Sequence, residues 1–363
     1  MLWLTVLHVL GVAVMWCLIW EVSEHWWIGS VVTFLPRLPG LLPGVLLLFA
    51  SLLVWSRAFW VNLAVVLFTL VSIMGFNVPW QSTWEHLTKS EPAAVADLPT
   101  IRLVSANVQA FGPDFGLLLR EVLHAKPDVI AFQEAARPPK LLDEQFPDWH
   151  VVRKRGLWVG SKWPVKLLGQ CDSDVYQRVT AIAVEVDAPF GKFVLTDLHL
   201  MTARRSLIHL KPKALVNGEG PRHVTAALRE RDEEARQTRA FLADFSHDTP
   251  SIVCGDFNMP TSSSIYRTYF SDFTNAFEAA AWGFGYTAPC KAPGFWPTNT
   301  PWQRVDHILA SGHWQVVASH IGLRDGSDHR LIAATLRLRG RDNLPPVERG
   351  GPVDLSDAVE RLR

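Results

Sequence analysis

Three long runs without a charged residue occupy the first 84 positions of the 363-residue chain and limit what this part can fold into. The runs are Leu2 to Trp20, Leu38 to Ser56 and Ala58 to Trp84. A helix that crosses the roughly 30 Å hydrocarbon core of a bilayer needs about 20 mostly apolar residues, so each run is long enough. We therefore predict a membrane domain over residues 1–77 with three transmembrane helices, at about 2–20, 38–55 and 59–77.

The flanks of these runs favour membrane spans over a cleaved signal peptide or a buried hairpin. Amphipathic indole rings collect where a span meets the headgroup region of a bilayer. Eight tryptophans lie near the predicted span ends: Trp3, Trp20, Trp26, Trp27, Trp55, Trp60, Trp80 and Trp84. Neither a basic segment nor a small-residue cleavage site follows Met1, as a signal peptide would require. The sequence predicts an integral, multi-pass protein of the cell inner membrane.

The few charges near the spans predict their orientation. Arg57 lies beside the short second connection, and the positive-inside rule places that connection in the cytoplasm. The first connection carries Glu21 and Glu24 as well as Arg37, and does not oppose this orientation. With three spans, the amino terminus is inside and everything after Trp84 is extracytoplasmic.

The rest of the chain has the composition of an ordinary globular protein. Its 35 acidic and 35 basic residues give no net charge, so overall charge favours no particular partner. We predict a linker at 78–99, a mixed α/β domain at 100–340 and a flexible tail at 341–363. Apolar patterning predicts helices at 116–125 and 223–245. It predicts strands at 101–108, 128–134, 164–170, 179–187, 192–199, 251–257, 304–311, 314–322 and 329–338.

Four cysteines show neither the pair spacing of a metal site nor a disulfide framework. Cys17 and Cys254 lie in apolar runs, and we expect both to be buried thiols. Cys171 and Cys290 can form a disulfide if the domain is extracytoplasmic, and the sequence leaves this open.

Polar side chains end several of the predicted strands. Any one of them is typical of a turn, because Asp, Asn and His side chains hydrogen-bond the backbone that follows a strand. Together they bring acids, amides and histidines to strand ends that can meet at one sheet edge. Such oxygen-rich sets suit Mg²⁺, Mn²⁺ or Ca²⁺ better than zinc, and they can orient a water and take its proton. Neither a P-loop nor a Gly-x-Ser-x-Gly motif is present, which disfavours P-loop nucleotide hydrolysis and serine hydrolysis.

Six segments carry a specific resemblance. In chain order they read SANVQAF, DVIAFQEA, LTDLHL, VCGDFNMP, RVDHILA and GSDHRLI. This ordered set resembles the endonuclease/exonuclease/phosphatase superfamily, which includes deoxyribonuclease I, exonuclease III, sphingomyelinases and inositol-polyphosphate phosphatases. The resemblance covers about residues 100–338 and suggests a membrane-anchored, bacterial-type member. It implies a deoxyribonuclease I-like two-sheet α/β sandwich, here preceded by three transmembrane helices, with the site where loops gather at one edge.

The resemblance also implies which residues bind metal. Glu134 matches the metal-binding glutamate of the family, with Asn107 and Asp328 close to the ion. The expected ion is Mg²⁺, with Mn²⁺ or Ca²⁺ as alternatives.

Five further residues match catalytic positions of the family. His329 looks like the histidine that acts on the attacking water or the scissile phosphate, and Asp306 would hold its imidazole in the working tautomer. Asp256 and Asn258 match the pair that positions the nucleophile and a phosphate oxygen. His199 matches a second histidine, which contacts phosphate or assists the leaving group.

Three segments bear on substrate choice. Residues 176–184 offer no obvious acid to support His199, unlike some nucleases of the family. Residues 201–223 are basic and are either a solvated insertion or a surface for polyphosphate, nucleic-acid backbone or anionic lipid. The aromatic residues of 282–303 either pack the loop, which we favour, or stack on bases or enter a membrane surface.

The sequence therefore predicts a membrane-anchored, divalent-metal-dependent phosphoesterase that cleaves its ester by water attack, without a phosphoenzyme. Attachment to the bilayer, the expected partner, favours a lipid headgroup as substrate. A metal-dependent endonuclease or exonuclease acting on nucleic acid is the alternative. A membrane scaffold or receptor that has lost turnover is a further alternative, because fold alone does not establish activity.

Overall fold

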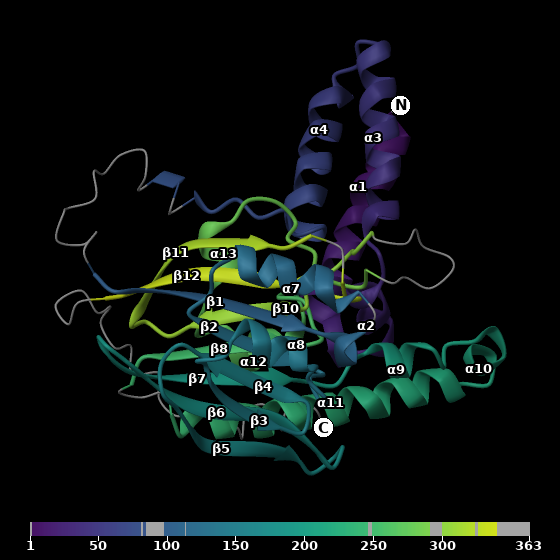
Figure 1. The fold of residues 1–363 in the computed structure, drawn as a ribbon. Coiled ribbons are helices and arrows are strands. Elements are labelled where there is room, and N and C mark those ends of the chain that lie inside the picture. Colours follow the sequence, from purple (N-terminus) through teal and green to yellow (C-terminus); the bar gives the residue numbers. More distant parts are fainter. Residues whose placement is uncertain are drawn as a thin grey trace.

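A computed structural model describes residues 2–80, 83–84, 98–112, 114–245, 249–290, 300–323 and 326–339. Two six-stranded sheets pack against each other, helices cover their outer faces, and an apolar helical unit stands away from them (Figure 1). The two-sheet α/β sandwich predicted from the sequence is confirmed. Most of the predicted linker at 78–99 and the tail at 341–363 lie outside the described residues.

The first sheet has the strand order β11-β12-β1-β2-β4-β3. Its strands are β1 (Thr100–Asn107), β2 (Val129–Gln133), β3 (His150–Lys154), β4 (Leu157–Ser161), β11 (Trp314–Ile321) and β12 (Ile332–Leu338). β1 and β2 run parallel and are joined through α7 (Phe115–His124), while β12 pairs antiparallel with β1. α8 (Lys140–Gln145) follows β2. This topology brings the carboxyl ends of β1 and β2 to one edge.

The second sheet has the order β5-β6-β7-β8-β10-β9. Its strands are β5 (Val165–Ser173), β6 (Arg178–Ala188), β7 (Gly191–His199), β8 (Ser251–Asp256), β9 (Thr274–Asn275) and β10 (Asp306–Ala310). β7 and β8 run parallel, and the connection between them contains α9 (Arg204–Leu207), α10 (Pro212–Val216) and the long α11 (Glu219–Ala243). Two short helices, α12 (Ser264–Phe270) and α13 (Ala276–Ala280), follow β8.

The core lies between the sheets. Inward-facing side chains of both sheets are fully buried there, including Leu103, Val129, Ile182, Ile252 and Ile308. Burying such a side chain contributes about 1.5–3 kcal/mol, so this layer holds the two sheets face to face. Strand edges at the rim of this layer are therefore fixed relative to one another.

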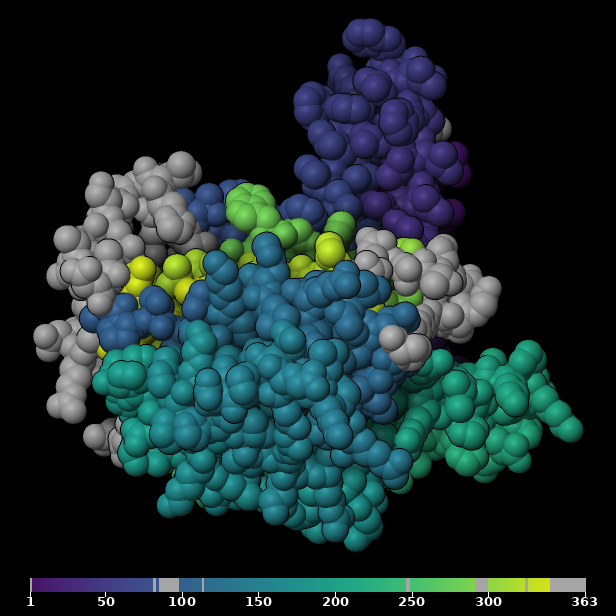
Figure 2. Space-filling view, in the orientation of Figure 1, coloured from purple at the N-terminus to yellow at the C-terminus, as the bar shows by residue number. Residues whose placement is uncertain are grey.

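Residues 2–74 form the helical unit. Its elements are α1 (Leu2–Cys17), the π-helix η1 (Leu18–Val22), the 3₁₀ turn η2 (Ser23–His25), α2 (Trp27–Phe34), α3 (Leu38–Leu53), α4 (Ala58–Phe68) and the π-helix η3 (Thr69–Ile73). α1, α3 and α4 stand side by side and project from the sandwich as a column (Figures 1 and 2). The turn between α3 and α4 lies at the end of this column that is far from the sheets (Figure 1).

The prediction of three membrane spans is confirmed only in part. By length and apolar composition, one continuous helix among the described residues is able to cross a membrane, Leu2–His25. The second predicted span belongs to a pair, Trp27–Phe34 and Leu38–Leu53, bent by 71°. The third, Ala58–Ile73, is shorter than a span requires. It ends early because Asn77 turns to the sandwich, where its backbone N–H donates to Gly283 O at 2.9 Å.

One of the two expectations for buried cysteines is wrong. Cys254 is buried as predicted, but Cys17 is exposed on the surface of the helical unit. Cys171 and Cys290 are both thiols in the structure, so the disulfide that the sequence left open is not formed.

Candidate active site

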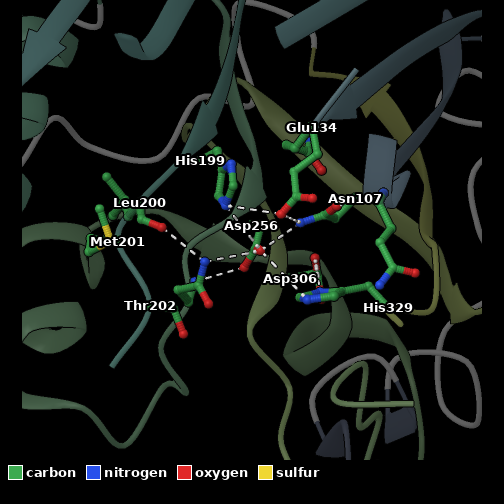
Figure 3. A network of polar contacts seen from close by, with 12 residues as sticks. Asn107, Glu134, His199, Leu200, Met201, Thr202, Asp256, Asp306 and His329 are labelled. Atoms are coloured by element: carbon green, nitrogen blue, oxygen red, sulfur yellow. Dashed lines mark hydrogen bonds and ion pairs between the residues drawn. The ribbon is translucent and has the colours of Figure 1, made fainter. Parts of the chain in front are cut away.

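Strand ends from both sheets meet at one edge of the sandwich (Figure 3). In the first sheet, β1 ends at Asn107 and Glu134 directly follows β2. In the second sheet, His199 and Asp256 end the parallel strands β7 and β8 in matching register, and Asp306 opposes Asp256 on antiparallel β10.

Glycine at position 255 permits the close approach of β7 and β8. Its φ of +138° lies in a region that residues with a side chain rarely adopt. A Cβ at this position would lie 2.0 Å from Leu198 O on the neighbouring strand. A residue with a side chain at position 255 would therefore push apart the two strands that carry His199 and Asp256.

His329 and Asp306 form the tightest pair in the site. The Nδ1 of His329 lies 2.9 Å and 3.1 Å from the two carboxylate oxygens of Asp306, both residues being almost fully buried. Nδ1–H therefore donates to the carboxylate, and Nε2 is directed toward Asp256, 3.8 Å from its Oδ2. Burial acts to lower the pKa of His329, but the charges of Asp306 and Asp256 outweigh it and raise the pKa well above its usual range. The ring is therefore held as a cation at the edge of the site.

Asp256 lies at the centre of the cluster and is 1% exposed. Its Oδ2 accepts hydrogen bonds from the side-chain amides of Asn107 and Asn258, both at 3.1 Å, and its Oδ1 accepts from the backbone N–H of Asn258 at 2.9 Å. Burial raises the pKa of Asp256; the charges of His329 and His199 oppose this, and the charge of Asp306 adds to it. A nearby positive charge therefore stabilises the ionised form of Asp256.

Glu134 forms the open side of the site, and the buried Asn107 lies beside it. The side chain of Glu134 is 42% exposed, and its Oε1 accepts from Asn107 Nδ2 at 3.1 Å. Glu134 has a φ of +56°, an uncommon backbone conformation that directs its carboxylate back to the strand ends. Asn107 therefore bridges the carboxylates of Glu134 and Asp256.

His199 differs from His329 because its imidazole lies farther from the carboxylates. Its Nε2 lies 3.6 Å from Asp256 Oδ2 and 3.9 Å from Glu134 Oε1. Burial lowers the pKa of His199 to about 4, with Asp256 opposing and the nearby Arg178 adding to the shift. His199 is therefore neutral at physiological pH. The charged residue that β6 places near His199 is Arg178. This agrees with the lack of an acid in residues 176–184.

A buried polar link joins the two sheets beneath the site. Gln133 Nε2 on β2 donates to Asp197 Oδ1 on β7 at 2.6 Å, and both side chains are fully buried. Burial raises the pKa of Asp197 well above its usual range. This bond fixes the strand that ends in Glu134 relative to the strand that ends in His199.

Seven of the eight predicted site residues are joined by hydrogen bonds or close polar contacts. They are Asn107, Glu134, His199, Asp256, Asn258, Asp306 and His329. In the described part of the chain, the carboxylate of Asp328 contacts the Ser327 hydroxyl instead, at 3.4 Å, while its charge raises the pKa of His329.

Asp256, Asp306 and His329 form a possible metal site. One ligand atom from each lies within 4.8 Å of the others. This set differs from the predicted ligands Asn107, Glu134 and Asp328, whose role stays a prediction. The donor chemistry fits a divalent cation, because two buried carboxylates lie side by side and the pKa of Asp256 is raised.

Two charged residues that support the loops of the site, one directly and one through the other, were not predicted from the sequence. Arg231 on α11 is 2% exposed, and Glu24 in η2 pairs with it. A helical pattern was available as a signal, because Arg231 falls on the same face as the buried Val224, Leu228 and Ala235. A charged side chain within an apolar stripe needs a buried partner.

A model of the Endonuclease/Exonuclease/phosphatase family matches residues 104–329, well over half of the chain, and the chain belongs to this family. The family and the Asp/His cluster at the sheet edge identify the protein as a phosphoesterase. No curated protein sequence matches the chain.

Solved structures are similar to the chain at low identity. One family protein from Bacteroides thetaiotaomicron is 14% identical, with a TM-score of 0.49, covering 67% of this chain and 99% of its own. A mannosyl-6-phosphatase from the same organism is 15% identical, with a TM-score of 0.47, covering 65% and 99%. The human Nocturnin catalytic domain is 16% identical, with a TM-score of 0.46, covering 67% and 96%.

Proposed function

We propose that the protein is a membrane-anchored, divalent-metal-dependent phosphoesterase that cleaves a phosphodiester or phosphomonoester of a lipid headgroup by direct attack of water. The observation that carries the proposal is the contact set of Asp306, His329 and Asp256 at one sheet edge. An imidazolium and a carboxylate with raised pKa values lie within 4 Å of each other, which suits opposite roles in one reaction.

These pKa directions divide the catalytic work. His329 is held protonated by Asp306, so its Nε2–H stabilises negative charge on a phosphate oxygen. Asp256 accepts the proton of the attacking water, because a raised pKa makes it a stronger base than an ordinary carboxylate. Asn258 keeps this carboxylate in place through its backbone and side-chain N–H groups. Neutral His199 binds a second phosphate oxygen as a hydrogen-bond donor.

We propose Mg²⁺ as the ion, with Mn²⁺ or Ca²⁺ as alternatives. Glu134 would hold it, with Asn107 and Asp328 near, because Glu134 is the exposed carboxylate while the oxygens of Asp306 already accept from His329. When bound, the ion offsets negative charge on the phosphate. Asp256 and Asp306 lie beside this position and gain from the same positive charge.

Exposed apolar side chains of the helical unit support membrane anchoring. Leu7, Leu46, Leu53 and Trp60 are 67%, 70%, 79% and 71% exposed, and they lie along α1, α3 and α4. A continuous apolar surface of this kind is rare on soluble proteins and marks a contact with lipid or protein. We propose that the column of Figure 2 lies in the bilayer as three closely packed helices. Arg57, at the far turn, then favours an extracytoplasmic sandwich.

A basic arm, residues 201–223, supports a lipid substrate. It begins two residues after His199, and the charge of Arg205 contributes to the lowered pKa of that histidine. The arm carries Arg204, Arg205, Lys211, Lys213 and Arg222 against a single acid, Glu219. An apolar cavity of about 360 Å³ separates it from α2, lined by Trp27, Val31, Leu35, Leu207, Leu210 and Leu215. Basic side chains beside apolar ones are typical of surfaces that bind anionic lipid.

The proposal is tested by comparing substrates with the purified full-length protein in Mg²⁺. Vesicles of phosphatidylglycerol with a labelled headgroup, plasmid DNA and bis-p-nitrophenyl phosphate are each incubated with wild type, Glu134→Gln and His320→Ala. We expect release of labelled headgroup that Glu134→Gln abolishes and that His320→Ala, an exposed histidine on β11, leaves unchanged. Cleavage of DNA alone would favour the nuclease alternative. Failure to cleave all three would favour the scaffold.

A further inference from the structure

A buried arginine lies beside the active site without belonging to it. Arg231 occupies the middle of α11 and is 2% exposed. Burying a guanidinium away from water is costly unless every donor direction finds an acceptor. The groups that accept hydrogen bonds from Arg231 show which parts of the structure it holds together.

Two of its nitrogens hold the loops that follow the catalytic strands. Nε donates to Met201 O at 3.0 Å, and one terminal nitrogen donates to Asn258 O at 3.2 Å. Met201 lies two residues after His199, and Asn258 lies two residues after Asp256. His199 and Asp256 are register partners on β7 and β8. The planar guanidinium of Arg231 therefore joins the loops that follow β7 and β8, each at the second residue after the register pair.

The remaining nitrogen pairs with the helical unit. It lies 3.3 Å from Glu24 Oε1, and both side chains are 2% exposed. The other oxygen of Glu24 accepts from the hydroxyls of Ser263, at 2.6 Å, and Ser264, at 3.1 Å, at the start of α12. The ring of Phe34 lies against the guanidinium, with its centroid at 4.9 Å. Two elements of the helical unit, η2 and α2, thus enclose the arginine.

Neighbouring contacts make the arrangement stiff. Glu234, one turn along α11 from Arg231, accepts from the backbone N–H of Met201 at 2.6 Å. The side-chain amide of Asn258 donates to Leu200 O at 2.9 Å, so the two loops are also bonded directly. A change in the position of Arg231 is therefore transmitted to both loops at once.

We propose that Arg231 and Glu24 are positioning residues that set the spacing between His199 and Asp256, so that the helical unit is part of the active-site scaffold. The pair acts through the two loops, and neither residue touches the reacting atoms. This inference rests on the proposed phosphoesterase function only because turnover is its first readout. A displacement of about 1 Å in a supporting residue is able to reduce turnover about 10²-fold.

The test uses the full-length protein and conservative variants. Arg231→Lys keeps the charge but replaces a planar fork of donors with a single ammonium, which cannot align with three acceptors in the same geometry. Glu24→Gln keeps the shape and removes the charge. Arg239→Lys is the matched control, because Arg239 lies on the same helix and pairs with Asp272 at 2.7 Å but contacts neither loop.

On bis-p-nitrophenyl phosphate, we expect Arg231→Lys to lower kcat at least about tenfold with KM nearly unchanged, because the loss lies in alignment of bound substrate. Glu24→Gln is expected to lower kcat in the same way but less, and Arg239→Lys to leave kcat at the wild-type value. Wild-type kcat in both Arg231→Lys and Glu24→Gln would overturn the inference, as would an equal loss in Arg239→Lys.

A second readout does not depend on turnover. The ring ¹³C and ¹⁵N chemical shifts of His199 report its surroundings even in a protein without activity. We expect these shifts to change in Arg231→Lys and to stay unchanged in Arg239→Lys. Absent turnover with a changed His199 signal would refute the proposed function and keep the inference, whereas an unchanged signal would refute the inference itself.

Discussion

The site edge of the sandwich and the helical unit use charged residues in opposite ways. At the site edge, Asp256, Asp306 and His329 gather charges whose mutual interactions shift their pKa values. In the helical unit, charges are few, and two of the four, Glu24 and Arg37, are buried against the sandwich. The comparison teaches that a charge in an apolar segment serves docking as readily as it serves membrane topology. Arg37 therefore carries little information about orientation.

The largest expected effect concerns the site edge and follows removal of the divalent ion. Chelation should lower turnover of a phosphodiester by about 10³-fold, because the negative charge of the phosphate is then no longer offset by the ion. Added Mg²⁺ or Mn²⁺ should restore the rate, measured as nitrophenolate release. An unchanged rate in the presence of chelator would show that turnover at this site does not depend on a metal ion.

The next effect concerns Asp306 and has a defined sign with pH. The charge of Asp306 raises the pKa of His329, so Asp306→Asn should lower that pKa and reduce kcat about 10²-fold or more. Because the protonated ring is the active form, the alkaline limb of the pH–rate profile should move to lower pH. The stability that His329 contributes is present below its unfolded pKa and lost as pH rises through its folded pKa. The variant should lose this pH dependence, measured by denaturation between acidic and alkaline pH.

On the helical side, Arg37→Ala should weaken the docking of the unit without changing the chemistry. Its guanidinium donates to Ile73 O at 2.7 Å, Thr33 O at 2.9 Å and Ser262 Oγ at 2.8 Å. The substitution removes these three hydrogen bonds from a buried position. We expect a loss of about 1–3 kcal/mol in the free energy of unfolding, and faster proteolysis between the unit and the sandwich. Arg57→Ala, at an exposed position, is the control and should change stability by less than about 0.5 kcal/mol. Equal effects of the two substitutions would contradict the distinction between docking and topology.

The smallest expected effect concerns the basic arm, which begins two residues after His199 and borders α2 of the helical unit. Lys211→Ala combined with Lys213→Ala should weaken attraction to an anionic bilayer by about 1 kcal/mol per charge. KM for an anionic lipid should rise roughly 30-fold, while kcat and KM for a soluble diester stay unchanged. Titration of vesicles with increasing anionic lipid measures this difference. An unchanged KM for the lipid would contradict lipid binding by the arm and indicate a solvated insertion.

The same two regions differ in how far the sequence predicts them. Strand ends at the site were predictable because each motif joins an apolar run to a polar end, as in Val253 to Asp256, and all six motifs occur in order. The hairpin β3–β4 was missed, because β3 is largely exposed and lacks an apolar run.

The helical unit was harder to predict because hydropathy does not show what an apolar residue contacts. The run from Ala58 to Trp84 carries no charged residue, yet the helix ends at Ile73. Beyond it, the side-chain amide of Asn77 donates to three backbone oxygens in and directly after α13, including Ala281 O at 2.7 Å. Arg231 lies on the buried face of α11, but this helical pattern does not show which residue it pairs with. Long-range partners decide both cases, and local patterns do not identify them.

The central claim is that the site edge hydrolyses phosphate esters with His329 as its fixed cation. The most direct measurement is kcat of full-length His329→Ala against wild type on bis-p-nitrophenyl phosphate in Mg²⁺, with folding checked by circular dichroism. The account predicts a loss of at least about 10²–10³-fold with an unchanged fold, the magnitude expected when one preorganised charge or donor is removed. A folded variant that turns over at the wild-type rate would contradict it.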